Sequence, residues 1–367
     1  MKTTTKRSAT TRAGLMAILM LAASYIAGTA SLHAQGRSLQ TPPANIQLRD
    51  SFDTPPADAQ TLSIVAAAQA FLASLDPDQR RAAVYDFADN TQRANWSNFP
   101  EGAVKRGGVM LGDLSDAQKT ALDALLATVL SEDGITNIDW QLAAEATLGT
   151  GGRVQFGPQY YYTSFLNEPV IDAPWMLQFG GHHLAINVTI NGPDISFSPM
   201  LTGGEPLNIT YGGEQLYITA RETAAALAFM GGLDADQKAV AIRGTRPINL
   251  VLGPGEFGTT IAPEGLKASA LNAAQKAQLL ALVSTRLGHI NADDYAAKMA
   301  RITADLDETW FGWWGPEDTP GAAYYRVTGP SVVIEYSPQG RGQDVTNHAH
   351  NMYRDPENDY GIQWIAQ

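Results

Sequence analysis

A helix-capping pattern occurs four times in this chain, and its spacing limits the possible folds more than any other feature. Each copy has leucine, a capping Asp, Ser or Asn, and glutamine three positions after the capping residue. This is the spacing of a capping box, which begins a helix. The copies lie at residues 75–80, 114–119, 233–238 and 271–276, so the first and third are 158 residues apart and the second and fourth 157. The repeated spacing predicts an internal duplication.

The segments beside the pattern agree with this interpretation. Residues 66–72 (AAAQAFL) resemble residues 224–230 (AAALAFM) at the same offset of 158. We expect residues 60–210 and 218–367 to form two related halves, packed as one unit around a pseudo-twofold axis. Two copies are too few for a solenoid, which needs about three. Chance similarity between alanine-rich helices is the alternative explanation.

Each half is predicted to begin with helices and to end with antiparallel hairpin strands. Helical periodicity extends over residues 62–87, 116–130, 219–230, 274–287 and 292–306. In the first half, two apolar strands flank Gly180 and Gly181, which is a good signal for a two-residue hairpin turn. In the second half, two similar strands flank Gly329 and Pro330. Helices and antiparallel strands that are segregated in this way predict an α+β fold.

The N-terminus has the order of a secretory signal peptide. Four basic residues precede an apolar run over residues 13–27, and small residues follow up to Ala34. The run is shorter than the roughly 20 residues that cross a bilayer as a helix, although an uncleaved anchor is the alternative. We therefore expect a signal peptide over residues 1–34, cleaved after Ala30 or Ala34, and an extended leader over residues 35–59. The mature protein would be exported, periplasmic or secreted, with no membrane span.

The composition excludes several classes of function. Asp and Glu outnumber Lys and Arg by 37 to 25, and the net charge of −12 becomes −16 when the four basic residues of the signal peptide are removed. Affinity for phosphate backbones comes mainly from Lys and Arg, so nucleic acid is not an expected partner. The chain has no cysteine. Disulfides, thiolate metal sites and cysteine nucleophiles are therefore excluded.

Four of the five histidines beyond the signal peptide fall in two short segments, His182-His183 and His348-Ala349-His350. Side chains alternate along a strand, so His182 would share the apolar face of the strand after Gly181 and His183 the polar face. A hydrogen-bonded core histidine is the alternative for His182. In an extended segment His348 and His350 would lie on one side, which suits two nitrogen ligands of a metal; a surface loop is the alternative. The isolated His289 is predicted to interact with carbonyls at a helix end.

The duplication does not require either histidine segment. Aligning Gly180 with Gly329 places Ser331 and Val332 opposite the first pair, and Pro199 and Leu201 opposite the second. Histidines that are added to one half only favour function over packing. If the halves meet around a pseudo-twofold axis, His182, His183, His348 and His350 could form one site. Two to four imidazoles with a carboxylate would suit Zn, Cu, Fe or Ni, and the spacing does not select among these metals.

Several carboxylates could complete such a site. Glu205 lies in a Gly-Gly-Glu-Pro turn, and Asp355 and Asp359 lie in the polar C-terminal tail. Glu335 lies in an apolar strand, where an unpaired carboxylate is unfavourable, and Arg326 on the preceding strand is its expected partner. Glu205, Glu335 and Arg326 are therefore candidate catalytic residues. A structural salt bridge explains the pair of Glu335 and Arg326 equally well.

These segments together resemble a known family. The resemblance is carried by residues 175–187 with their Gly-Gly-His-His-Leu motif, the Gly-Glu-Pro turn at 204–206, the strands from Tyr325 to Glu335, and residues 347–361 with their Asn-His-Ala-His motif. The chain is similar to the bacterial and fungal family called domain of unknown function 3500, from about residue 60 to the C-terminus. The resemblance implies membership of this family but no reaction.

The sequence thus predicts an exported metal-binding protein, with a metal-dependent hydrolytic or oxidative activity as the leading hypothesis. A bound metal makes water a nucleophile near neutral pH, which would suit hydrolysis. The main alternative is a non-enzymatic protein that binds a sugar-like or other small molecule on aromatic side chains of residues 160–162 and 310–314, which are otherwise core residues. A structural protein of the cell envelope is a third possibility. A small-molecule substrate or ligand is the expected partner.

Overall fold

The computed structural model describes residues 46–149, 153–254, 261–340 and 344–367, and within them one large mixed sheet dominates. Ten strands form its main path, and all neighbouring pairs except the two at the edges are antiparallel. In spatial order they are β1 (Val84–Tyr85), β3 (Tyr162–Leu166), β4 (Trp175–Gly181), β5 (Leu184–Asn191), β7 (Met200–Gly204), β15 (Ala349–Arg354), β14 (Val333–Pro338), β13 (Tyr324–Thr328), β12 (Trp310–Trp314) and β10 (Ile242–Gly244).

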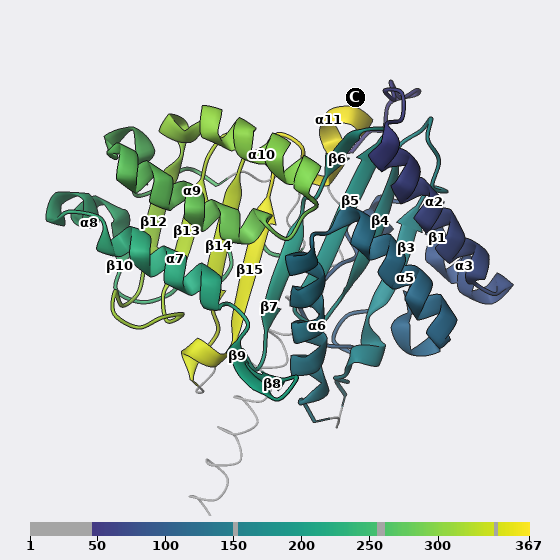
Figure 1. Cartoon of the computed structure of the whole chain (residues 1–367), viewed down its shortest axis with the longest axis horizontal. Helices are drawn as coiled ribbons and strands as arrows, with labels where there is room; N and C mark the ends of the chain where they lie inside the picture. The colour runs from purple at the N-terminus through teal and green to yellow at the C-terminus, as the bar shows by residue number, and fades with distance from the viewer. Residues whose placement is uncertain (1–45, 150–152, 255–260, 341–343) are drawn as a thin grey trace, which may run out of the picture.

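Five short strands complete the described β-structure. Three of them extend the sheet: β2 (Val109–Met110) pairs with β3, β6 (Asp194–Ser196) with β5, and β11 (Leu266–Lys267) with β12. The other two, β8 (Asn208–Tyr211) and β9 (Glu214–Tyr217), form a separate hairpin. This hairpin lies below β7 in Figure 1, at the end of the sheet where β7 ends.

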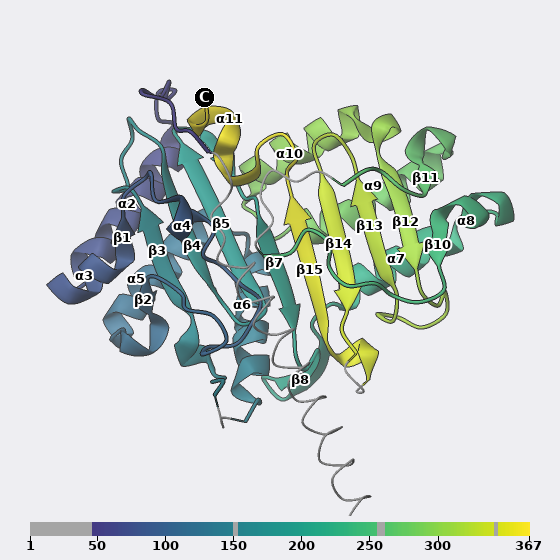
Figure 2. The ribbon, with the colours of Figure 1, turned by 180° about the vertical axis from the view of Figure 1, so that it is seen from behind.

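Helices cover one face of the sheet, as Figure 1 shows. The first half supplies α2 (Ala59–Ser74), α3 (Pro77–Ala83), α5 (Asp116–Val129) and α6 (Glu132–Ala146), and the second half supplies α7 (Ala220–Gly231), α8 (Ala235–Ala241), α9 (Ala273–Leu287) and α10 (Ala292–Ala304). The opposite face, seen in Figure 2, is covered mainly by loops with the short helices α4 (Asn90–Arg93) and α11 (Ile362–Ile365). The expected α+β class is therefore confirmed.

All four predicted capping boxes are present. Asp76, Ser115, Asp234 and Asn272 each accept a hydrogen bond from the backbone N–H of the glutamine three residues later, and each glutamine side chain bonds back to the capping residue. Two orphan N–H groups at each helix start are satisfied in this way. The first box also divides the helix expected over residues 62–87 into α2 and α3. The periodicity did not single out α6, whose buried face is unusually polar.

The two halves meet where β7 pairs with β15, which we call the central seam. Five residue pairs join these antiparallel strands, from Ala349 with Gly204 to Tyr353 with Met200. The strand order mirrors itself about the seam, because β5, β4, β3 and β1 follow on one side and β14, β13, β12 and β10 on the other. Cross-strand partners also correspond: Gln178 pairs with Asn187, and the residues 148 positions later, Arg326 and Glu335, pair in the same way.

Each face of the sheet has its own hydrophobic core. The larger core lies under the helices and includes Phe71, Phe165, Trp175 and Phe229, all fully buried. A smaller core on the loop-covered face contains Trp96, Met176, Leu201, Met352 and Tyr360 with their neighbours. The aromatic residues Tyr161, Trp313 and Trp314, considered above as a possible ligand platform, are buried.

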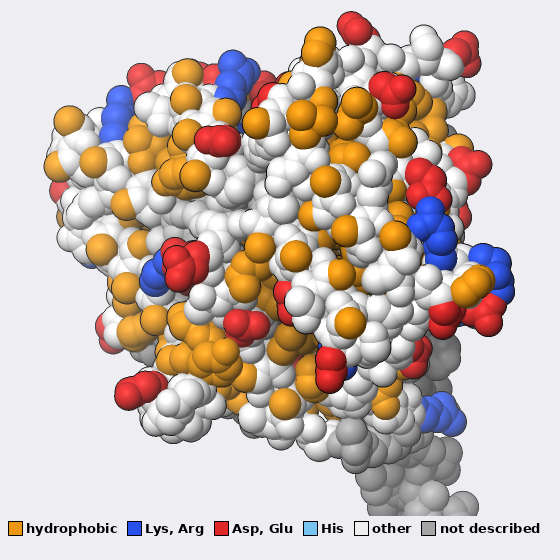
Figure 3. Space-filling model, turned by 45° about the vertical axis from the view of Figure 1, so that its right-hand side comes forward, with side chains coloured by type: hydrophobic (Ala, Val, Ile, Leu, Met, Phe, Trp, Pro, Cys, Tyr) orange, Lys and Arg blue, Asp and Glu red, His pale blue; other side chains and the backbone are white. Residues whose placement is uncertain are grey.

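In the view of Figure 3, acidic and basic side chains are scattered over the surface, and apolar side chains gather toward its lower left. The predicted signal peptide and residues 35–45 of the leader lie outside the described residues. Of the helices that the structure describes, none combines the length and the apolar character that crossing a bilayer requires.

Candidate metal centre

The four clustered histidines meet at one end of the central seam, where β5 begins, β7 ends and β15 begins. His182 and His183 form the turn between β4 and β5, His348 directly precedes β15, and His350 lies in β15 opposite Gly203 of β7. The structure therefore brings together two segments that are 165 residues apart, as measured from His183 to His348. Three neighbouring strands position them.

The turn between β4 and β5 differs from the prediction. Gly180 and Gly181 belong to β4, and Gly181 pairs with Leu184, so the two histidines rather than the two glycines form the turn. A Cβ on Gly181 would lie 2.8 Å from the ring of Tyr161, which explains why glycine occupies this strand position. His183 adopts a φ of 58°, in the left-handed region that few non-glycine residues occupy. The expected placement of His182 and His183 on opposite faces of a strand is therefore wrong.

Three of the histidines direct ring nitrogens toward one another. The Nε2 atoms of His183 and His348 are 3.0 Å apart, and the ring of His350 lies 5.1 Å from that of His183 and 5.3 Å from that of His348. One nitrogen from each ring lies within 4.8 Å of the other two, close enough to hold a metal ion. Zinc–nitrogen bonds of about 2.0–2.1 Å place the ligand nitrogens of a tetrahedral site about 3.3 Å apart, so the spacing of these imidazoles is close to that of a metal site.

His182 has different surroundings. Its Nδ1–H donates to Oε2 of Glu145 at 2.8 Å, and its carbonyl accepts from the hydroxyl of Tyr161 at 2.7 Å. Its ring stacks on that of His183, with 3.7 Å between centroids and 30° between planes. Glu145, His182 and His183 form a second group whose ligand atoms lie within 4.8 Å of one another. The two groups share His183.

Asn98 packs against His350 without occupying either nitrogen in the ring plane. Its Nδ2 lies 3.3 Å from Nδ1 and 3.2 Å from Nε2 of His350. The lone-pair directions of the two ring nitrogens diverge, so a donor equidistant from both must lie over the ring face. This contact helps to orient the ring of His350.

Glu205 lies on the outer side of the cluster. Its Oε1 is 3.6 Å from Nδ1 of His348, the nitrogen that faces away from His183. The side chains of His348 and Glu205 are 25% and 31% exposed, whereas His182, His183 and His350 are buried. The cluster therefore opens to solvent on the side of Glu205 and His348.

The pKa of His183 lies well below its usual value, chiefly because the ring is buried and also because His182, His350 and His348 surround it. A lowered pKa keeps the imidazole neutral, which is the form that binds a metal. Protons therefore compete weakly for this ring near neutral pH.

Glu335 and Arg326 form a separate polar group. They are cross-strand neighbours as expected, but Glu335 accepts from the backbone N–H groups of Val251 and Leu252, at 2.8 and 2.7 Å, and from the hydroxyl of Tyr324 at 2.6 Å. Arg326 donates to Glu264 at 2.5 Å. Among the described residues, neither group of potential metal ligands includes Glu335. The carboxylate anchors a loop in this structure.

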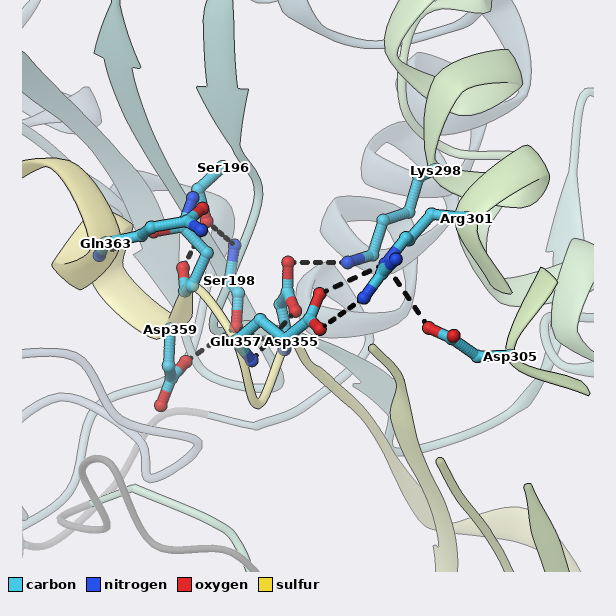
Figure 4. A network of polar contacts seen from close by, with 10 residues as sticks. Ser196, Ser198, Lys298, Arg301, Asp305, Asp355, Glu357, Asp359 and Gln363 are labelled. Carbon is cyan, nitrogen blue, oxygen red and sulfur yellow. Dashed lines mark hydrogen bonds and ion pairs between the residues drawn. The ribbon is translucent and has the colours of Figure 1, made fainter. Parts of the chain in front are cut away.

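The carboxylates of the C-terminal tail are also paired elsewhere, as Figure 4 shows. Asp355 bonds Lys298 of α10 at 2.6 Å, and Asp359 accepts from Ser198 at 2.6 Å and from Arg354 at 2.5 Å. These contacts fix the tail to the sheet and to α10, so the structure does not bring Asp355 or Asp359 into the histidine cluster. His289 is buried and accepts from Arg286 at 3.0 Å, in place of the predicted contact with helix carbonyls.

Sequence reasoning missed two residues of the site, Glu145 and Asn98. Glu145 belongs to α6, where Asn137, Gln141 and Glu145 lie four residues apart and share the buried face. Polar residues at that spacing on a buried helix face are a signal, because buried polar groups require partners. Asn98 lies in an irregular segment, and nothing in the local sequence distinguishes it.

Comparison with known proteins places the chain in a family but adds no activity. Searches among curated proteins and among solved structures return no match. A family model described as "Protein of unknown function (DUF3500)" matches residues 57–362, which is most of the chain. The protein therefore belongs to this family.

Proposed function

We propose that this protein is exported and binds one divalent transition metal through His183, His348 and His350, which it uses in a hydrolytic or oxidative reaction. The observation that carries the proposal is the convergence of three imidazoles from distant segments, with 3.0 Å between the Nε2 atoms of His183 and His348. Imidazole nitrogens are ligands for Zn, Cu, Fe and Ni, and the donor set does not select among these metals.

The carboxylate on the outer side of the cluster supports this assignment. A metal-binding histidine commonly donates its second ring nitrogen to a carboxylate, which fixes the ring and makes the ligand more basic. Glu205 lies on that side of His348, with its Oε1 3.6 Å from Nδ1, slightly beyond hydrogen-bonding distance. Its side chain is also more exposed than that of His348, so it can contact a substrate at the open side. We therefore assign Glu205 as the positioning residue of His348 and as the candidate proton acceptor.

A divalent ion in this site would supply an acidified water for hydrolysis or a redox centre for oxidation. The chain contributes the arrangement around it: His183 and His350 bind from the buried side, His348 binds from the exposed side, and Glu205 orients His348. Glu335 and Arg326 have structural roles in this proposal, because their contacts hold the loop at residues 251–252 and Glu264.

We also propose that the two halves of the chain arose by an internal duplication. The mirrored strand order and the constant offset of 148 between cross-strand pairs support it. This offset replaces the 149 obtained by aligning glycines, and it places Pro330 and Ser331 opposite His182 and His183. The histidine turn is thus specific to the first half under either alignment.

The alternative of a non-enzymatic small-molecule receptor has less support. The aromatic residues proposed as a ligand platform belong largely to the core. A narrow pocket lies beside the histidine turn, lined by Gln92, Gln178 and Asn187 among others. These amides already bond one another, Gln92 to Gln178 at 3.1 Å and Gln178 to Asn187 at 3.0 Å.

An activity screen tests the enzymatic part of the proposal. Chelated protein reloaded with Zn, Cu, Fe or Ni is assayed on panels of ester, amide, phosphoester and phenolic substrates. We expect turnover that requires metal and falls at least tenfold in Glu205→Gln. Turnover that is unchanged by chelation would contradict a metal-dependent reaction.

A further inference from the structure

We propose that His182 is not a ligand of the metal but an aromatic platform that positions His183, and that Glu145 holds the platform in place. This inference rests on the proposed metal site and specifies which histidines bind. It separates the two overlapping groups of potential ligands, of which only the one formed by His183, His348 and His350 would coordinate the ion.

The stacking of the two rings carries the argument. A metal accepts the lone pair of an imidazole nitrogen, which lies in the plane of the ring. Two ligand rings on one ion must therefore have planes that lead toward a common point. The rings of His182 and His183 instead lie face to face, 3.7 Å apart and 30° from parallel, so their lone pairs run side by side. His183 and His348 meet at 68°, with their nitrogens facing each other, as ligands of one ion do.

The contacts of His182 fix its ring from several sides. Glu145 accepts from Nδ1 at 2.8 Å, and the ring of Phe156 packs at 5.3 Å from that of His182. Glu145 itself is only 3% exposed and also accepts from the backbone N–H of Gly157 at 3.1 Å. Tyr161 holds the backbone through its bond to the carbonyl of His182. Nδ1 of His182 is therefore used to orient the ring.

His183 needs such a support because its backbone position is exceptional. It is the second residue of a two-residue turn and has a φ of 58°. A turn residue lacks the cross-strand neighbours that restrain a side chain within a sheet. The face of His182 supplies the restraint on one side, and the ring of His350 lies on another at 5.1 Å. A restrained ring loses less conformational freedom when it binds a metal.

Substitution tests the platform with a matched pair of variants. Both carry Glu145→Gln, because a buried carboxylate without its histidine would destabilise the fold, and the glutamine oxygen can still accept from Gly157. One adds His182→Phe, which retains an aromatic ring but no ligand nitrogen. The other adds His182→Ala, which removes the ring. His183→Ala is the control, because it removes a residue that we assign as a ligand.

Zinc affinity is measured by competition with a chromophoric chelator, and the ligand set by Cu²⁺ electron paramagnetic resonance. We expect the Phe variant to keep one metal per chain, with an unaltered nitrogen-coupling pattern and most of the wild-type affinity. The Ala variant should lose 10–100-fold in affinity, as is typical when a group that orients a ligand is removed. His183→Ala should lose binding.

Three outcomes would contradict these expectations. If the Phe variant loses metal as His183→Ala does, or loses one nitrogen from the copper spectrum, His182 is a ligand and the inference is overturned. It is also overturned if the Ala variant binds as tightly as the Phe variant. A wild-type protein that binds no metal would instead overturn the proposed function. Circular dichroism of each metal-free variant separates these outcomes from loss of the fold.

Discussion

The Nε2 atoms of His183 and His348 lie 3.0 Å apart although the two residues are 165 positions apart in the chain. His183 precedes β5 and His348 precedes β15, and these strands flank the end of β7. A metal bound between them would link the two halves across the central seam. Its binding free energy would therefore add to the stability of the folded protein, because the unfolded chain does not hold these ligands together.

The first prediction concerns this added stability. At a free zinc concentration of about 100 times the dissociation constant, the free energy of unfolding should rise by about 2.7 kcal/mol. Thermal unfolding with a buffered series of zinc concentrations measures the effect. The variant His350→Ala should show no such increase, whereas His289→Gln, which alters a histidine outside the cluster, should retain it. An equal increase in both variants would contradict the assigned ligands.

The second prediction concerns the backbone of the turn in the metal-free protein. The φ of 58° at His183 suits glycine and asparagine but disfavours β-branched residues. We expect His183→Gly to unfold at nearly the wild-type denaturant concentration and His183→Val to lose about 1–2 kcal/mol relative to it. Urea unfolding in the presence of a chelator provides the comparison. Equal stability of the two variants would show that the turn does not require this conformation.

The helix starts were predictable because capping is local. Asp76, Ser115, Asp234 and Asn272 each need only the next three residues to complete a capping box, and all four do so. The hairpin turn was not predictable on the same terms. Gly180 and Gly181 are typical of a turn, but the close approach of the Tyr161 ring, which comes from a distant part of the chain, explains their place in β4.

The third prediction concerns two buried charged residues beside the seam. Glu222 of α7 and Arg286 of α9 are 3% and 1% exposed, and Arg286 donates to the carbonyl of Met200 at 2.9 Å. Burial raises the pKa of Glu222 and lowers that of Arg286 to about 10, while each charge favours the ionised form of the other.

Removing one partner should leave an uncompensated charge in the core. We expect Arg286→Met to destabilise the protein by about 1–3 kcal/mol, because the carbonyl of Met200 and the ring of His289 lose their donor. Glu222→Gln combined with it should restore the part of the loss that comes from the unbalanced charge of Glu222. Chemical denaturation of both single variants and of the double variant measures the interaction free energy between Glu222 and Arg286. Arg80→Met, which breaks an exposed pair with Glu168, should change stability by less than about 1 kcal/mol. Additive effects at Glu222 and Arg286 would contradict the pairing.

The fourth prediction concerns pH. Burial, with the nearby charge of Arg286, holds the pKa of His289 well below its usual value, so the folded protein keeps this ring neutral. The unfolded chain binds a proton near pH 6.5, and stability therefore falls as the pH drops below that value. Between pH 7.5 and 5.5 the loss from this residue is about 1.4 kcal/mol.

His289→Gln removes the titrating ring and tests that loss. Denaturation of the metal-free proteins at both pH values should show a drop that is about 1.4 kcal/mol smaller in the variant than in the wild type. Drops of the same size would mean that His289 titrates alike in the folded and unfolded chains.

The histidine site was predictable in part. The short spacing between His182 and His183, and between His348 and His350, was visible in the sequence. Each pair lacks a counterpart in the other half of the chain, which favoured a functional role over a packing role. The division of roles within the site depends on tertiary contacts. Glu145 orients His182 from a helix 37 residues earlier, and Asn98 covers His350 from 252 residues earlier. The polar spacing on the buried face of α6 marks Glu145 only as a residue that needs a partner, and nothing in the local sequence marks Asn98.

The metal content of the untagged protein tests the central claim most directly. Protein purified without an affinity tag is dialysed against buffered zinc and analysed by mass spectrometry for bound metal, beside the variant with His348→Ala and His350→Ala. We predict one metal ion per chain in the wild type and near-complete loss in the double variant, which should remain folded. Substoichiometric metal that the double substitution leaves unchanged would contradict the account.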